Sequence, residues 1–226
     1  MAGLALLPLA AWGVIRFALT VVKVNACPTA MELAADLAST PDPRTPPAID
    51  HPSFWSHPTA SRLQTQLLEP DSQPFGGQFL TTQLASLAEA AKTQHNPNSW
   101  KVLSEHSFTG FAQNSWRTPS GLTLAHSVYE FGSQREAESF MRITTGYACQ
   151  FAEEAWDPVT ERPSIDRRTV VAMRVRYGTG EARDQITWVE GRSRHQVWIH
   201  GELPDDHAQV LDFAEEAIRH VRVATQ

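Results

Sequence analysis

Apolar and polar residues alternate with a period of two in several segments of the chain, and this spacing predicts β-strands. Between residues 171 and 177, apolar side chains alternate with Arg174 and Arg176, as expected for a strand with two different faces. The other predicted strands share this alternation or a high content of aromatic and β-branched residues: 107–116, 122–131, 185–189 and 194–200. The last two are joined by a short turn and predict a hairpin.

Helical spacing of apolar residues predicts three helices in the same region, at 80–91, 133–151 and 204–222. Ser133 and Glu136 form a capping box at the start of the second helix. The order is helix, two strands, helix, three strands, helix, and the turns between strands are short. We therefore expect an α+β fold with a single antiparallel sheet and helices mainly on one face, preceded by an apolar N-terminal helix.

The first 22 residues contain one charged side chain, Arg16, and their apolar run 4–15 has the length of a signal-peptide core. Residues 1–24 are therefore predicted to be either a cleaved export signal or a retained membrane anchor. A buried N-terminal helix of a soluble cytoplasmic protein is the remaining alternative. Topology stays open, because Lys23 follows the apolar run and the basic residues usual before it are missing.

A proline-rich stretch follows the apolar segment. Residues 38–60 hold six prolines, and proline fixes φ and removes a hydrogen-bond donor. The pattern predicts a membrane anchor or export signal at 1–24, a linker at 25–60 and an α+β globular domain at 61–226.

The chain has two cysteines, Cys27 and Cys149. Cys27 ends the sequence Val-Asn-Ala-Cys, which is similar to a bacterial lipobox, so it is a candidate for lipidation. The two cysteines are alternatively candidates for one disulfide, and lipidation would exclude that bond. Two unpaired buried thiols are the third alternative.

Charge and motif content argue against several function classes. With 25 acidic and 19 basic residues the net charge is −6, and nucleic-acid binding needs an excess of Lys and Arg. Nine histidines are present, but no H-x-x-x-H or C-x-x-C spacing occurs, so neither a metal site nor a cofactor is predicted. The sequence also lacks a G-x-S-x-G motif and a phosphate-binding loop, and no catalytic residue is assigned.

A local excess of arginine is the one candidate binding feature. Residues 162–194 contain eight arginines and four acidic residues. Arg174 and Arg176 share one face of their predicted strand, and Trp198 shares a face with Arg194 and His200. We expect these five residues to stand on an open face of the sheet, where Arg and Trp would bind an anionic or polar ligand or a protein partner.

One stretch carries a family resemblance. Tyr129-Glu130-Phe131, then Ser133, Ala137 and Phe140, then Cys149 resemble the strand, helix and cysteine of actinobacterial extracytoplasmic sensor-like domains. Such domains occur as lipoproteins and as outer domains of membrane serine/threonine kinases. The resemblance implies a non-catalytic module that senses a ligand or partner.

The combined expectation is a non-enzymatic, extracytoplasmic, ligand- or partner-binding domain, attached to the cell membrane through residues 1–24 or secreted. Two alternatives remain open. One is an enzyme whose site is assembled from dispersed residues, and the other is a soluble cytoplasmic interaction protein.

Overall fold

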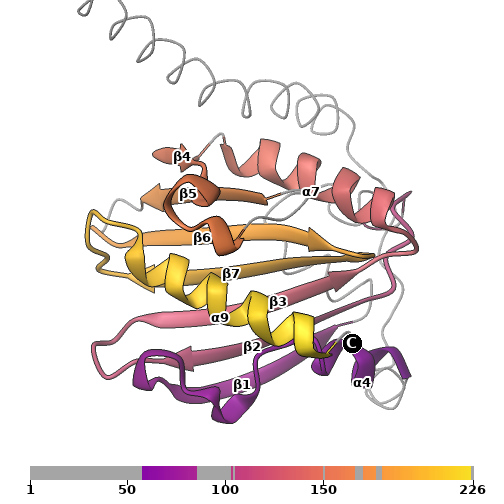
Figure 1. The fold of residues 1–226 in the computed structure, drawn as a ribbon, viewed down its shortest axis with the longest axis horizontal. Coiled ribbons are helices and arrows are strands. Elements are labelled where there is room, and N and C mark those ends of the chain that lie inside the picture. Colours follow the sequence, from indigo (N-terminus) through magenta and orange to yellow (C-terminus); the bar gives the residue numbers. More distant parts are fainter. Residues whose placement is uncertain are drawn as a thin grey trace, which may run out of the picture.

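The computed structural model describes residues 58–85, 103, 105–149, 151–165, 170–176 and 180–224. These residues form one seven-stranded antiparallel sheet with strand order β1-β2-β3-β7-β6-β5-β4, packed with helices (Figure 1). The strands are β1 (Gln78–Ala85), β2 (Gly110–Arg117), β3 (Thr123–Glu130), β4 (Glu154–Trp156), β5 (Val170–Arg176), β6 (Ala182–Glu190) and β7 (Ser193–Gly201). The α+β class and the single antiparallel sheet are therefore confirmed.

The longer helices are α7 (Gln134–Cys149) and α9 (Ala208–Ala224), and the shorter ones are α4 (Pro58–Gln64) and α8 (Pro158–Glu161). Single 3₁₀ turns occur at Pro70–Ser72, Pro74–Gly76 and Pro163–Ile165. None of the helices in the described ranges is both long and apolar enough to span a bilayer. The predicted apolar segment at 1–24 and most of the predicted linker at 25–60 lie outside those ranges.

The predicted hairpin of β6 and β7 is present, and β2 and β3 form a second one. β2 and β3 pair without interruption from Gly110–Glu130 to Arg117–Thr123, and β6 and β7 pair from Ala182–Gly201 to Glu190–Ser193. β3 then pairs with β7, so the two hairpins lie side by side at the centre of the sheet. The alternation along β5 is also confirmed, because its residues pair in register with β6.

The prediction of a helix at 80–91 is wrong for residues 80–85, which the structure describes. Residues 78–85 form strand β1 at the edge of the sheet. Leu80 and Leu84 are four positions apart, a spacing that fits one face of a helix and equally one face of a strand. Phe79, Thr81 and Thr82 favour the strand. The pairing of β1 with β2 shifts between Phe79 and Thr81, which leaves Leu80 in a bulge.

Helices pack on both faces of the sheet, which we name after the long helix on each. On the α9 face, Leu124, Ile186, Trp188 and Val197 pack against Phe213 and its neighbours on α9. α4 covers the other end of the same face, over Ala112 and Val128.

On the α7 face, Phe111, Tyr129 and Val189 pack against Phe140 and Met141 of α7. The expectation of helices mainly on one face therefore holds for α4 and α9, while α7 lies on the opposite face. The reason is that β2, β3 and β6 carry apolar residues on both sides at the end of the sheet where α7 packs.

Helix α7 begins as the capping box predicted. The Glu136 backbone N–H donates to the Ser133 hydroxyl over 3.3 Å, and the Glu136 carboxylate accepts hydrogen bonds from the hydroxyls of Ser107 and Ser133. These bonds lower the pKa of Glu136. At its other end the helix reaches Cys149, which is disulfide-bonded. The only other cysteine in the sequence is Cys27.

Candidate binding face of the sheet

A row of polar side chains crosses five adjacent strands on the α7 face. Gln83, Gln113, Ser127, Gln196 and Thr187 are direct cross-strand neighbours on β1, β2, β3, β7 and β6. Residues opposite each other in register point to the same face. The Ser127 hydroxyl donates to the Gln113 Oε1 over 2.7 Å. We call these five residues the polar row.

The next row of the same face contains Trp198 and Gln185, which oppose each other on β7 and β6. The Gln196 amide donates to the Gln185 Oε1 over 2.9 Å and so links the polar row to this one. The guanidinium of Arg183 lies 4.8 Å from the centre of the Trp198 ring, a cation–π distance. His200 follows on β7, with its Nε2 3.6 Å from a carboxylate oxygen of Glu181.

Arg194 lies on the other side of the polar row, beneath α7. Its guanidinium is 5.0 Å from the Tyr129 ring centre and 5.6 Å from the Phe140 ring centre. Its Nη2 donates to the Gln196 Oε1 over 3.4 Å. The residue is only 5% exposed, and burial lowers the pKa of Arg194 because desolvation disfavours the charged form.

Charge is divided between the two faces of the sheet. The carboxylates carried by the seven strands are Glu130, Glu154, Asp184 and Glu190, and the register places all of them on the α9 face. On the α7 face the strands carry Arg117, Arg183, Arg194 and His200 and no acidic residue. The α7 face is therefore rich in hydrogen-bond donors, although the chain as a whole is acidic.

The sequence-predicted residues are divided between these faces. Arg194, Trp198 and His200 share the α7 face, as the alternation along β7 predicted. Arg174 and Arg176 share the α9 face, because Arg174 pairs with Asp184 and Asp184 with Ile199. The structure therefore does not unite the five residues in one surface.

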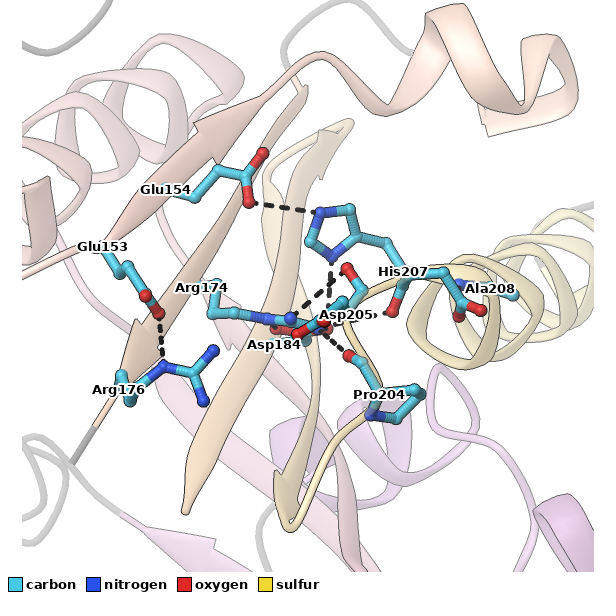
Figure 2. Close-up of polar contacts among 10 residues, drawn as sticks. Glu153, Glu154, Arg174, Arg176, Asp184, Pro204, Asp205, His207 and Ala208 are labelled. Carbon is cyan, nitrogen blue, oxygen red and sulfur yellow. Dashed lines mark hydrogen bonds and ion pairs between the residues drawn. The ribbon is translucent and has the colours of Figure 1, made fainter. Parts of the chain in front are cut away.

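The expectation of an open face is wrong for Arg194, which is 5% exposed, and for Arg174, which is 3% exposed. The Nε and Nη2 of Arg174 each donate to one oxygen of Asp184 over 2.6 Å (Figure 2). The same guanidinium donates to the backbone carbonyls of Pro204, Asp205 and Asp206 over 2.8–3.4 Å. Its donors are used to hold the loop that leads into α9, since that face of the sheet is covered.

His207 extends the Arg174–Asp184 pair toward β4. Its Nδ1 lies 3.4 Å from Asp184 and its Nε2 lies 3.6 Å from Glu154, on opposite sides of the ring (Figure 2). The ring is stacked on Trp156 at 3.7 Å between centres. Arg176 lies outside this cluster and pairs with Glu153 over 2.7 Å, with both side chains exposed by more than two fifths.

Two buried histidines on the α9 face escaped the sequence analysis. His126 and His195 are both fully buried, and their rings lie 5.9 and 5.1 Å from the Trp188 ring. The Leu68 backbone N–H donates to the His126 Nδ1 over 3.1 Å. Burial, together with the nearby His195 and His220, holds the pKa of His126 well below its usual value. This pair belongs to the core.

Glu130 forms a second buried charge cluster at the end of β3. Its carboxylate accepts two hydrogen bonds from Arg62 of α4, over 2.8 and 2.6 Å, and others from Thr109 and Arg192. Burial alone would raise the pKa of Glu130, but the bonds and charges of Arg62, Thr109 and Arg192 outweigh it and lower the pKa. The cluster fixes α4 to the sheet.

The polar row was also missed by the sequence analysis. Gln113, Ser127 and Gln196 are visible in the sequence as polar residues of three different strands, but their alignment depends on the register between those strands. In the part of the chain that the structure describes, no group of three or more His, Cys, Asp or Glu residues is arranged to hold a metal ion.

Comparison with known proteins places this fold beside a solved extracellular domain. The structure matches the extracellular domain of PknH from Mycobacterium tuberculosis with a TM-score of 0.51 and 12% sequence identity. The match covers 72% of this chain and 96% of that domain. No protein-family model and no curated protein sequence matches the chain. The likeness fits the resemblance to sensor-like outer domains that the Tyr129–Cys149 stretch indicated.

Proposed function

We propose that this protein is a non-enzymatic, extracytoplasmic domain that binds a polar ligand on the α7 face of its sheet. The observation that carries the proposal is the polar row, in which amide and hydroxyl side chains from five strands stand in register. Binding sites use a few convergent polar groups to orient a ligand. Amide and hydroxyl groups recognise polar molecules by hydrogen bonds without titrating near neutral pH.

Two observations support the proposed extracytoplasmic location. One is the similarity in fold to the extracellular domain of PknH. The other is the sequence, in which the apolar residues 1–24 and a proline-rich stretch precede the globular part. We propose that residues 1–24 attach the protein to the membrane or direct its export.

Thermal unfolding of the full-length protein in a non-ionic detergent, with a library of polar metabolites, tests the proposal. The test variant is Gln196→Leu in the polar row, and the matched control is Arg176→Gln, an exposed position on the α9 face. Compounds that raise the Tm of the wild type and of the control, but not of Gln196→Leu, support the proposal. Compounds that stabilise all three proteins equally bind elsewhere and would contradict it.

A further inference from the structure

We propose that the ligand of the α7 face carries a carboxylate, and that Arg194 binds this carboxylate while the polar row binds the rest of the molecule. This inference rests on the proposed function and assigns the chemical class of the ligand. Three independent features of the described residues lead to it, namely the state of Arg194, the unused donors around it and the distribution of charge.

The first feature is a buried positive charge with no negative partner. Arg194 is 5% exposed, and its contacts are the rings of Tyr129 and Phe140, a side-chain hydrogen bond with Tyr129 and the Gln196 amide oxygen. No carboxylate among the described residues pairs with it, unlike Arg174, which is equally buried and has Asp184. Burial of an unpaired charge is costly, and cation–π contacts recover part of that cost. A carboxylate ligand would supply the missing partner.

The second feature is a set of unused donors along the same face. The Nε atoms of Arg194 and Arg183 are buried and have no hydrogen-bond acceptor in the part of the chain that the structure describes. Gln185 and Gln113 use their amide oxygens as acceptors for Gln196 and Ser127, so it is their amide N–H groups that they would offer to a ligand. A surface that offers mainly donors selects a ligand that offers mainly acceptors.

The third feature is the charge difference between the faces. All four carboxylates of the strands lie on the α9 face, while the strand residues of the α7 face include three arginines and no acid. The strand residues of this face therefore carry a net positive charge, although the net charge of the chain is −6. Such a local charge favours anions over neutral molecules of the same shape.

A single carboxylate fits better than a doubly charged group. Arg194 offers one positive charge and a planar fork of donors, which matches a carboxylate in charge and geometry. Arg183 is 11 positions before Arg194 on the paired strand, three cross-strand rows away, or about 20 Å at strand spacing. It is too distant to neutralise a second charge at Arg194. Trp198, four residues along β7, is about 13 Å away, which sets the length of a ligand that contacts both.

The test measures the arginine Nε–H signals by NMR in the full-length protein in a non-ionic detergent. Acetate and gluconate are titrated beside their uncharged counterparts, acetamide and sorbitol, and beside inorganic phosphate. We expect acetate and gluconate to shift the Arg194 Nε–H signal to saturation and the two neutral compounds to leave it unchanged. Arg194→Gln should weaken gluconate binding about thirtyfold or more, whereas Arg176→Gln should bind as the wild type does.

Several outcomes would overturn the inference. If sorbitol and gluconate bind equally and shift the Gln113 and Gln196 amides but not Arg194, the polar face binds ligands without a carboxylate, and the proposed function survives alone. If phosphate binds more tightly than gluconate, the ligand class is wrong. If none of the five compounds shifts Arg194, the inference fails, and the metabolite screen decides the proposed function separately. Should Arg194→Gln fail to fold, the wild-type titrations still decide.

Discussion

Arg174 and Asp184 face each other across β5 and β6 and form a bidentate ion pair, with each side chain only 4% exposed. The pair does more than neutralise two charges, because the same guanidinium holds three carbonyls of the segment before α9. It thus ties the β7–α9 loop to the paired strands β5 and β6.

Replacing Arg174 by Met should therefore destabilise the protein by about 3–5 kcal/mol, since Asp184 would remain buried without a partner. Arg176→Met on the same strand removes an exposed pair with Glu153 and should cost at most about 1 kcal/mol. Urea unfolding of both variants measures the difference. A double variant, Arg174→Met with Asp184→Leu, should recover part of the loss. Equal stabilities for the two single variants would contradict the structural role of Arg174.

Stability should fall as the pH drops below about 6.5, because His126 is buried in its neutral form. The pKa of His126 is lower in the folded protein than in the unfolded chain, so the unfolded chain binds more protons between the two values. The stabilisation is therefore complete above about pH 6.5 and is lost as the pH falls toward the folded pKa. The acidic groups with lowered pKa, such as Glu130, add their own loss only below about 4.5.

The variant His126→Asn tests this assignment. An Asn side chain retains an acceptor for the Leu68 N–H, which now binds the His126 Nδ1, but it does not titrate. Thermal unfolding between pH 7 and 5 should show a smaller slope in the variant than in the wild type. An unchanged slope would mean that a group other than His126 dominates the transition.

Peptide mapping without reduction should find Cys149 linked to Cys27, because Cys149 is disulfide-bonded and the sequence offers one other cysteine. The bond would close a loop of more than 100 residues, worth up to roughly 4–5 kcal/mol in the chain-entropy model. Cys27→Ser and Cys149→Ser should therefore lower stability equally, and the double variant should lower it no further. A lipid mass on Cys27 or a bond between two chains would contradict the intramolecular link.

An alkaline phosphatase fused after Gln226 should be active in cells, because that enzyme needs an oxidising compartment to fold and the proposed location of the domain is extracytoplasmic. The full-length protein should partition with membranes or be exported, whereas a chain that begins at residue 58 should do neither. If the phosphatase is inactive and a reporter that works only in the cytoplasm is active at the same fusion position, the domain lies in the cytoplasm and the proposed location is wrong.

The sequence predicted correctly those features of the fold that depend on the residues of a single segment. The alternation along β5, the capping box at Ser133 and the hairpin of β6 and β7 were each read from neighbouring residues and are confirmed. The segment 80–91 is predicted as a helix because the spacing of Leu80 and Leu84 suits both structures, but residues 80–85 belong to β1. Pairing with β2 decided between them, and that pairing is not visible in the segment itself.

The candidate site shows the same limit at the level of strand register. Alternation placed Arg174 with Arg176, and Trp198 with Arg194, on common faces of their own strands. It did not show that the two pairs lie on opposite sides of the sheet, because that depends on how β5 and β7 align through β6. Nor did it reveal the polar row, whose members come from five strands and up to 113 positions of sequence (Gln83 to Gln196).

The bulge at Leu80 has a consequence for aggregation at the edge of the sheet. The sheet ends in two edges, and β4 at one of them is three residues long and bears Glu154. β1 at the other is eight residues long, with neither a charge nor a proline in Gln78–Ala85. A free strand of this kind recruits strands from other chains. The break in register at Leu80 shortens its regular part to the residues from Thr81 onward, so a deletion of Leu80 that straightened β1 would turn this edge into a seed for intermolecular sheets.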